Sequence, residues 1–168
     1  IVFSILCSPG LFLPSNVIAA DGSIDSTVEI NSSTTNGPTL SVNDKFGYGM
    51  ANIGDLDKDG VNDLAVGAYG DDNGGSYDNG AVHIMFMNTN GSIDSTVEIN
   101  ASTSNGPTLS ANDMFGSSIT NIGDLDNDGV DDLAVGAFGD DNGGDTRGAV
   151  HIMYLSHSIS GVALTKST

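Results

Sequence analysis

The chain contains a tandem repeat with an offset of 69 residues, and this repeat limits its fold more than any other feature. The segment GSIDSTVEIN at 22–31 returns unchanged at 91–100, and Phe46 returns as Phe115. The segment GAVHIM at 80–85 returns one residue early, at 148–153, so one residue is missing from the loop before it. Recurrence at such a period predicts that one supersecondary unit is built twice.

Each unit has the pattern of short strands separated by turns. In the first unit we expect strands near Phe46–Ile53, Asp63–Ala68, Ala81–Met87 and Ser95–Ile99, because short apolar runs alternate with segments rich in Gly, Asn and Asp. No window has sustained helical periodicity, so the predicted fold class is all-β. Four antiparallel strands per unit match one blade of a β-propeller, in which neighbouring blades cover both faces of the sheet.

The repeat also predicts how the chain is divided. We expect a leader at 1–20, a linker at 21–45, a first blade at 46–100, and a second blade at 101–168 that is incomplete or divergent at its end. The segment 21–45 also contains Ser26–Ile30, which we interpret as the last strand of a preceding blade. A closed propeller needs at least four blades, so two blades predict a fragment of a larger propeller or an array that needs partner chains. Further blades in the full-length chain are therefore expected.

The first twenty residues differ in composition from the rest of the chain. They are apolar and uncharged and end in small residues before Asp21, which is typical of the hydrophobic and cleavage regions of a secretory signal that lacks its basic start. A buried or edge strand is the alternative. Pro9 and Pro14 interrupt the run, so no membrane insertion is expected. The chain's single cysteine, Cys7, lies here. We expect an extracellular or cell-surface location.

An acidic loop lies between the first two predicted strands of each unit, GDLDKDGVND at 54–63 and GDLDNDGVDD at 123–132. Close carboxylates repel each other by roughly 1 kcal/mol per pair even in water, and the net charge of -18 supplies no compensation. A divalent cation bound between the carboxylates would compensate their charge. In the spacing D-x-D-x-D-G-x-x-D, positions one, three and five converge, the glycine permits a sharp turn, and the seventh residue presents its carbonyl oxygen.

Ligands that are all oxygen favour Ca²⁺, and a flexible loop disfavours Mg²⁺. The sequence thus predicts two structural Ca²⁺ sites, one per repeat, with these ligands: Asp55, Asp57, Asp59, Val61 and Asp63 in the first loop, and Asp124, Asp126, Asp128, Val130 and Asp132 in the second.

The flanks of the loop separate it from other calcium motifs. An EF-hand needs a glutamate at the twelfth position between two helices, but Val66 and Val135 stand there, inside predicted strands. The aspartates at the ninth position must therefore close each site. A β–loop–β calcium site preceded by Phe46-Gly47 and followed by Gly67-Ala68 resembles the FG-GAP repeat of integrin α-subunit propellers.

The same residues recur in the second unit as Phe115-Gly116 and Gly136-Ala137. Tyr69 and Phe138 replace the proline that often follows. The resemblance implies a propeller in which the calcium loop joins the first two strands of each blade. It also implies adhesion, or recognition of an extracellular protein or glycan ligand.

Other functions are weakly supported by the sequence. The acidic surface disfavours nucleic acid and anionic membranes as partners. No nucleophile elbow, phosphate-binding glycine loop or acid pair outside the calcium loops is present, so we expect no enzyme activity in this segment. Two alternatives remain open: the non-catalytic propeller portion of a secreted, phospholipase-like hydrolase, and a structural surface-layer component.

Two further repeated features are interpreted as structural. His83 and His151 occupy equivalent strand positions, which favours a packing role imposed by the repeat. The pairs Asp71-Asp72 and Asp140-Asp141 lie in loops rich in Gly and Asn and are expected to be solvated turns. A ligand or second cation at these pairs is the alternative.

Overall fold

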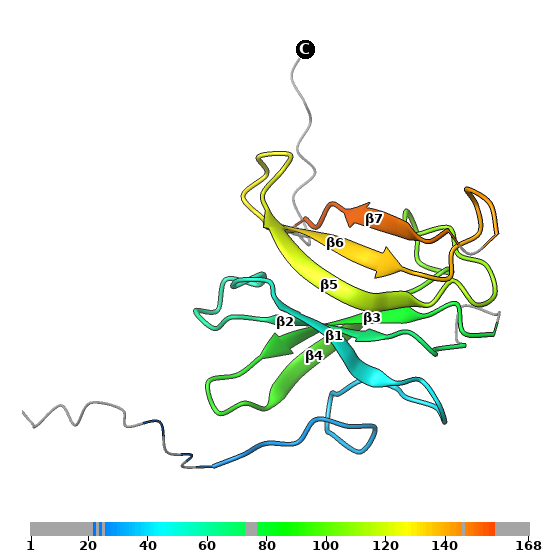
Figure 1. Ribbon diagram of the computed structural model, residues 1–168. Coiled ribbons are helices and arrows are strands. Elements are labelled where there is room, and N and C mark those ends of the chain that lie inside the picture. The colour runs from blue at the N-terminus through cyan, green and yellow to red at the C-terminus, as the bar shows by residue number, and fades with distance from the viewer. Residues whose placement is uncertain (1–21, 23, 25, 73–76, 146, 157–168) are drawn as a thin grey trace, which may run out of the picture.

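The structure is a computed structural model that describes residues 22, 24, 26–72, 77–145 and 147–156. These residues form two antiparallel sheets and no helix. The first sheet has the order β1-β2-β3-β4, and the second has the order β5-β6-β7 (Figure 1). The strands are β1 (Phe46–Asn52), β2 (Leu64–Ala68), β3 (Ala81–Met87), β4 (Ile93–Ile99), β5 (Phe115–Gly123), β6 (Asp132–Ala137) and β7 (Ala149–Met153).

The all-β prediction is confirmed, and each of the four strands predicted in the first unit is present within two residues of its expected bounds. Ser26–Ile30, expected as the last strand of a preceding blade, form no ladder with any described part of the chain, so that strand stays a prediction. The same ten-residue sequence at 91–100 contains β4, which pairs with β3 through partners such as Val82 and Ile99. A strand requires an adjacent edge, so the neighbouring strand decides the difference and the local sequence does not.

The main hydrophobic core lies between the two sheets. The first sheet contributes Ala65, Val82 and Ile84, and the second contributes a buried set consisting of Phe115, Leu133, Val135 and Ala137. Figure 1 shows β5 lying across the first sheet, next to β1, β2 and β3. The two sheets therefore pack face to face as consecutive blades would.

Small residues allow this close packing. A Cβ atom on Gly67 would collide with the carbonyl oxygen of Gly116, so β2 and β5 approach each other backbone to backbone. The segment 77–80 adds a second connection, since the backbone N–H of Phe115 donates to the carbonyl of Asn79 at 3.0 Å. The FG and GA dipeptides of the repeat thus meet at the junction between the sheets.

The first sheet is also covered on its other face. Val66, Met85, Met87 and Ile93 form a second buried cluster, against which Ile30 packs. All residues of β3 except Phe86 are buried, so both sides of this strand are covered. In the second sheet, by contrast, side chains of β7 such as Val150 are exposed.

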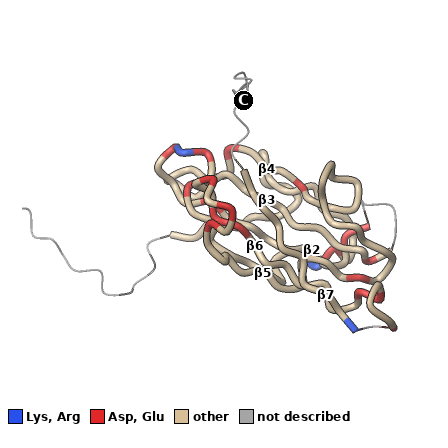
Figure 2. Tube along the Cα trace, turned by 90° about the horizontal axis from the view of Figure 1, so that it is seen from above, with Lys and Arg blue, Asp and Glu red and all other residues tan. Residues whose placement is uncertain are grey.

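The acidic loops lie at one end of the sheets, next to each other. Figure 1 shows the β1–β2 loop and the β5–β6 loop on the same side of the molecule. A small pocket between them is lined by Asp55 and Leu56 from one loop and by Gly129 and Val130 from the other. Seen from above, Asp and Glu residues gather in the loops at the ends of the strands (Figure 2).

Some sequence predictions concern residues outside the described part of the chain. These are the leader at 1–20 with Cys7, and the divergent end at 157–168. Among the described residues, no helix has the length and apolar character needed to cross a membrane.

Candidate metal centres

The two acidic loops have the same backbone conformation. The glycine at the sixth position has a positive φ in both, 94° at Gly60 and 89° at Gly129, as the predicted sharp turn requires. The fourth position also has a positive φ, 67° at Lys58 and 62° at Asn127. The pattern of glycines did not indicate this second left-handed position. A residue other than glycine adopts the left-handed backbone conformation at some cost in energy.

The carboxylate at the first position folds each loop around itself. Asp55 Oδ1 accepts the backbone N–H of Asp59 at 3.0 Å, and Asp55 Oδ2 accepts that of Gly60 at 2.9 Å. Asp124 makes the equivalent two bonds at 3.1 and 2.9 Å. Because the loop is closed by these bonds, it holds its carboxylates close together despite their like charges.

The carboxylate at the ninth position connects the loop to the sheet. Asp63 is fully buried; its Oδ2 accepts the backbone N–H of Leu56 at 2.8 Å, and its Oδ1 accepts that of Met87 at 2.9 Å. Asp132 makes the equivalent bonds in the second loop: its Oδ2 accepts the backbone N–H of Leu125 at 2.8 Å, and its Oδ1 accepts that of Leu155 at 3.0 Å. The aspartate spacing predicts a metal-binding role for these residues but not the anchoring role, which depends on residues distant in sequence.

Three carboxylates converge in each loop. Ligand atoms of Asp55, Asp57 and Asp63 all lie within 4.8 Å of one another, and so do those of the equivalent set, Asp124, Asp126 and Asp132. The fifth-position aspartates, Asp59 and Asp128, do not belong to these groups. Their Oδ1 atoms instead accept the N–H groups of Val61, at 2.7 Å, and Val130, at 2.8 Å. The structure therefore brings together three of the four predicted carboxylates in each loop.

The electrostatics of the first loop favour a cation. The pKa of Asp57 is raised from its usual value of 3.8, mainly by desolvation and further by the negative charges of Asp59, Asp63 and Asp55. A carboxyl group with a raised pKa is one whose charge is poorly compensated by its surroundings. A divalent cation at the centre of the group would supply that compensation, and carboxylate oxygens are the ligands that Ca²⁺ prefers.

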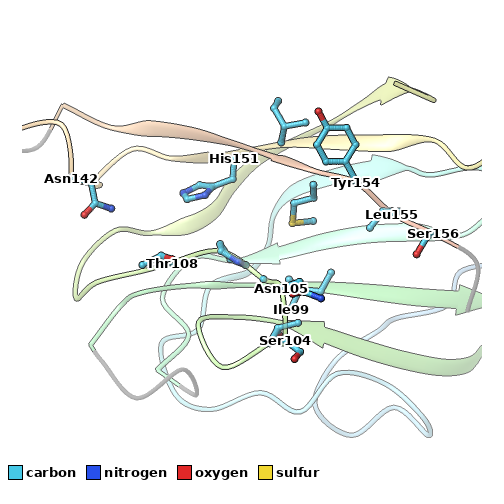
Figure 3. Close-up of a pocket in the computed structure, with 14 residues that line it drawn as sticks. Ile99, Ser104, Asn105, Thr108, Asn142, His151, Tyr154, Leu155 and Ser156 are labelled. Carbon is cyan, nitrogen blue, oxygen red and sulfur yellow. The ribbon is translucent and has the colours of Figure 1, made fainter. Parts of the chain in front are cut away.

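A separate pocket lies between β7 and the segment 103–108. It has a volume of about 780 Å³, and in Figure 3 His151 and Tyr154 lie on one side of it and Ser104 and Asn105 on the other. In the first repeat the corresponding position is occupied by β4. There, Asn36, the equivalent of Asn105, accepts a hydrogen bond from Thr96 Oγ at 2.7 Å. The pocket thus corresponds to the position of a fourth strand beside β7.

Comparison with known proteins identifies the repeat. The family model for the FG-GAP repeat matches residues 46–85 and 115–153, which cover β1, β2 and most of β3 in the first sheet and β5–β7 in the second. Both segments are FG-GAP repeats. FG-GAP repeats are propeller blades, so the four-stranded sheet is blade 1 and the three-stranded sheet is blade 2. The sheets do not close on themselves, which is consistent with a fragment of a propeller.

The FG-GAP blades are similar in sequence to integrin α chains. Integrin alpha-5 of Xenopus laevis is 39% identical over 120 residues, which cover 69% of this chain and 10% of that protein. Integrin alpha-6 of Homo sapiens is 41% identical over 100 residues, 58% of this chain and 8% of that protein. Integrin alpha-PS5 of Drosophila melanogaster is 36% identical over 100 residues, which cover 60% of this chain and 9% of that protein. The chain thus spans about a tenth of the length of these curated relatives.

Proposed function

We propose that the two FG-GAP blades form a calcium-stabilised part of an extracellular or cell-surface recognition module with an adhesion role. The observation that carries the calcium part is the duplicated loop: in each blade three carboxylates converge within 4.8 Å, held by the same backbone hydrogen bonds. Each loop would bind one Ca²⁺ and join the first two strands of its blade.

The calcium is proposed to be structural. The loop's own oxygens would fill most of the coordination sphere, with a contribution from the carbonyls of Val61 and Val130, so little room would remain for a substrate. We accordingly propose no enzyme activity for these blades. Calcium binding would stabilise the folded chain by mass action, because the unfolded chain has no assembled site.

Exposed aromatic side chains support a recognition role. Tyr48 and Tyr69 meet edge to face with ring centroids 4.8 Å apart, and Tyr69 lies 6.2 Å from Phe138 of the second blade. Tyr48 and Phe138 are 67% and 55% exposed. Aromatic residues of this kind are enriched at interfaces. Tyr69 and Phe138 follow β2 and β6 at the end of the sheets opposite the acidic loops, which suits an extracellular protein or glycan ligand.

The calcium proposal is tested by thermal unfolding of the chain in chelator and in millimolar Ca²⁺. A higher melting temperature in Ca²⁺ is expected, and equal temperatures would contradict a structural calcium. The recognition proposal is tested on arrays of glycans and extracellular matrix proteins. A Tyr48→Ser/Tyr69→Ser/Phe138→Ser variant should lose binding that Val42→Ser retains, since Val42 is exposed but outside the aromatic group. Equal binding by the two variants would contradict it.

Further blades are proposed as the partners of this segment in a larger propeller. The pocket beside β7 supports this, because its counterpart in blade 1 is filled by β4. The exposure of Val150 and Ile152 on β7 supports it too, since equivalent side chains of β3 are buried under blade 2.

A further inference from the structure

His83 is buried in blade 1 with no hydrogen-bond partner. It lies on β3 with an exposed fraction of 0%, and neither Nδ1 nor Nε2 has a partner among the described residues. Its ring packs edge-on against Phe46, with centroids 5.6 Å apart. A buried imidazole offers at least one lone pair and one N–H, and burial without partners is unfavourable. The packing role predicted from the repeat therefore leaves the polar atoms of this side chain unexplained.

Two carboxylates lie beside this imidazole. Asp71 follows β2 and is fully buried, and Glu98 on β4 is paired in register with His83. One ligand atom from each of Asp71, His83 and Glu98 lies within 4.8 Å of the others. Three neighbouring elements of blade 1 therefore direct their donor atoms toward one point. The solvated turn expected at Asp71-Asp72 is wrong for Asp71, although Asp72 is exposed as expected.

We propose that Asp71, His83 and Glu98 bind a divalent transition-metal ion, with Zn²⁺ as the best-suited metal, at a site separate from the acidic loops. The donor set decides the class of metal: imidazole nitrogen with carboxylate oxygens suits Zn²⁺, whereas Ca²⁺ prefers oxygen alone. Two carboxylates and a neutral imidazole also balance the charge of one divalent ion.

The surroundings of His83 keep it available as a ligand. Burial lowers the pKa of His83 from its usual 6.5, although the charges of Glu98 and Asp44 oppose that effect, so the imidazole is neutral near pH 7. A neutral ring is the form that binds metal. Donors bound to one Zn²⁺ at about 2.0–2.1 Å lie roughly 3.4 Å apart in a tetrahedron, which is compatible with ligand atoms that all lie within 4.8 Å of one another.

The second blade has only part of this arrangement. His151 Nε2 lies 3.8 Å from Asp140 Oδ2, but no glutamate stands beside it in the described structure, because the pocket of Figure 3 takes the position of the strand that would carry one. His151 is also 21% exposed. The site is therefore complete in blade 1 alone, and one transition-metal ion per chain is expected.

The experiment is a calorimetric titration of the full chain, without a histidine tag, with Zn²⁺ in millimolar Ca²⁺ so that the acidic loops are saturated. One Zn²⁺ should bind. Glu98→Gln should weaken the affinity for Zn²⁺ by roughly tenfold or more. Even the loss of a residue that only supports a metal ligand lowers metal affinity about 10–100-fold. The sequence offers a matched control in Glu29→Gln. Glu29 has the same neighbours in sequence and accepts the equivalent hydrogen bond, from Asn31 at 2.8 Å, as Glu98 does from Asn100 at 2.5 Å. Glu98 pairs with His83 in the sheet, whereas Glu29 pairs with no strand of the described structure.

Glu29→Gln should leave the affinity for Zn²⁺ unchanged. His83→Phe, which keeps an aromatic ring next to Phe46, should abolish Zn²⁺ binding. In the parent chain, Zn²⁺ should shift the imidazole NMR signals of His83. The proposal is overturned if Glu98→Gln and Glu29→Gln bind Zn²⁺ equally, if Zn²⁺ leaves the His83 signals unmoved, or if Ca²⁺ displaces the Zn²⁺.

Discussion

Asp63 Oδ1 accepts the backbone N–H of Met87 at 2.9 Å and so fixes the last carboxylate of the acidic loop to the end of β3. The equivalent bond in blade 2 joins Asp132 to Leu155 at 3.0 Å. Each loop thus contains two kinds of carboxylate: a buried one that is already bonded to the sheet, and exposed ones, such as Asp57, that face the proposed cation. The two kinds should respond differently to substitution.

Asp63→Ala should destabilise the chain even in chelator. It leaves the buried N–H of Met87 without an acceptor, which costs about 1–3 kcal/mol in the free energy of unfolding. Asp57→Ala, the control, should change that free energy by less than about 0.5 kcal/mol in chelator because Asp57 is exposed. Urea denaturation of both variants measures the difference. Equal stabilities in chelator would show that the bond between Asp63 and Met87 does not anchor the loop.

Gly67→Ala should separate the two blades. The added Cβ would collide with the backbone carbonyl of Gly116 across the junction, and a backbone cannot rotate away. Overpacking of this kind lowers the free energy of unfolding by about 1–3 kcal/mol, and we expect a value near the upper end for Gly67→Ala. Gly136→Ala is the matched control at the equivalent position of blade 2, where the nearest atom is the Ser118 hydroxyl, which can rotate. Denaturation midpoints that fall equally in both variants would rule out a tight junction at Gly67.

Asp113 should make stability depend on pH. Its pKa is raised from the usual 3.8, first by burial and then by the charges of Asp140 and Asp141, against the opposing effects of the Ser110 hydrogen bond and of His151. The folded chain therefore binds this proton more tightly than the unfolded chain, and the resulting stability is lost as pH rises through the folded pKa.

Asp113→Asn removes this charge and keeps an acceptor for the backbone N–H of Ser110. The stability of the variant relative to the parent chain should increase as pH rises above 3.8, the usual aspartate pKa, and through the raised pKa of the parent carboxyl. Thermal unfolding of both chains at several pH values measures this difference in stability, and NMR titration follows the Asp113 carboxyl group directly. A constant difference across this range would contradict a raised pKa for Asp113.

The repeat was sufficient to predict the strands and the position of the loops. Apolar alternation and turn residues are local, so β1 to β4 follow from the residues they contain. The segment 26–30 shows the limit of this reasoning. Its sequence is the same as that of residues 95–99 in β4, yet only residues 95–99 pair with another described strand, β3.

The sequence indicated most of the converging carboxylates but not their supports. Of the four that the spacing predicts to converge in the first loop, Asp55, Asp57 and Asp63 do so, and Asp59 does not. It could not indicate that Asp63 is bonded to Met87, since that contact joins residues on different strands. Nor could it place Asp71 beside His83, because strand register and loop path together create that neighbourhood.

Each acidic loop is proposed to bind one calcium ion. Calorimetric titration of the chain with Ca²⁺ tests it most directly, with Asp57→Ala and Asp126→Ala as single-loop variants. Two ions should bind to the parent chain and one to each variant. A stoichiometry that neither substitution changes would exclude these loops as the calcium sites.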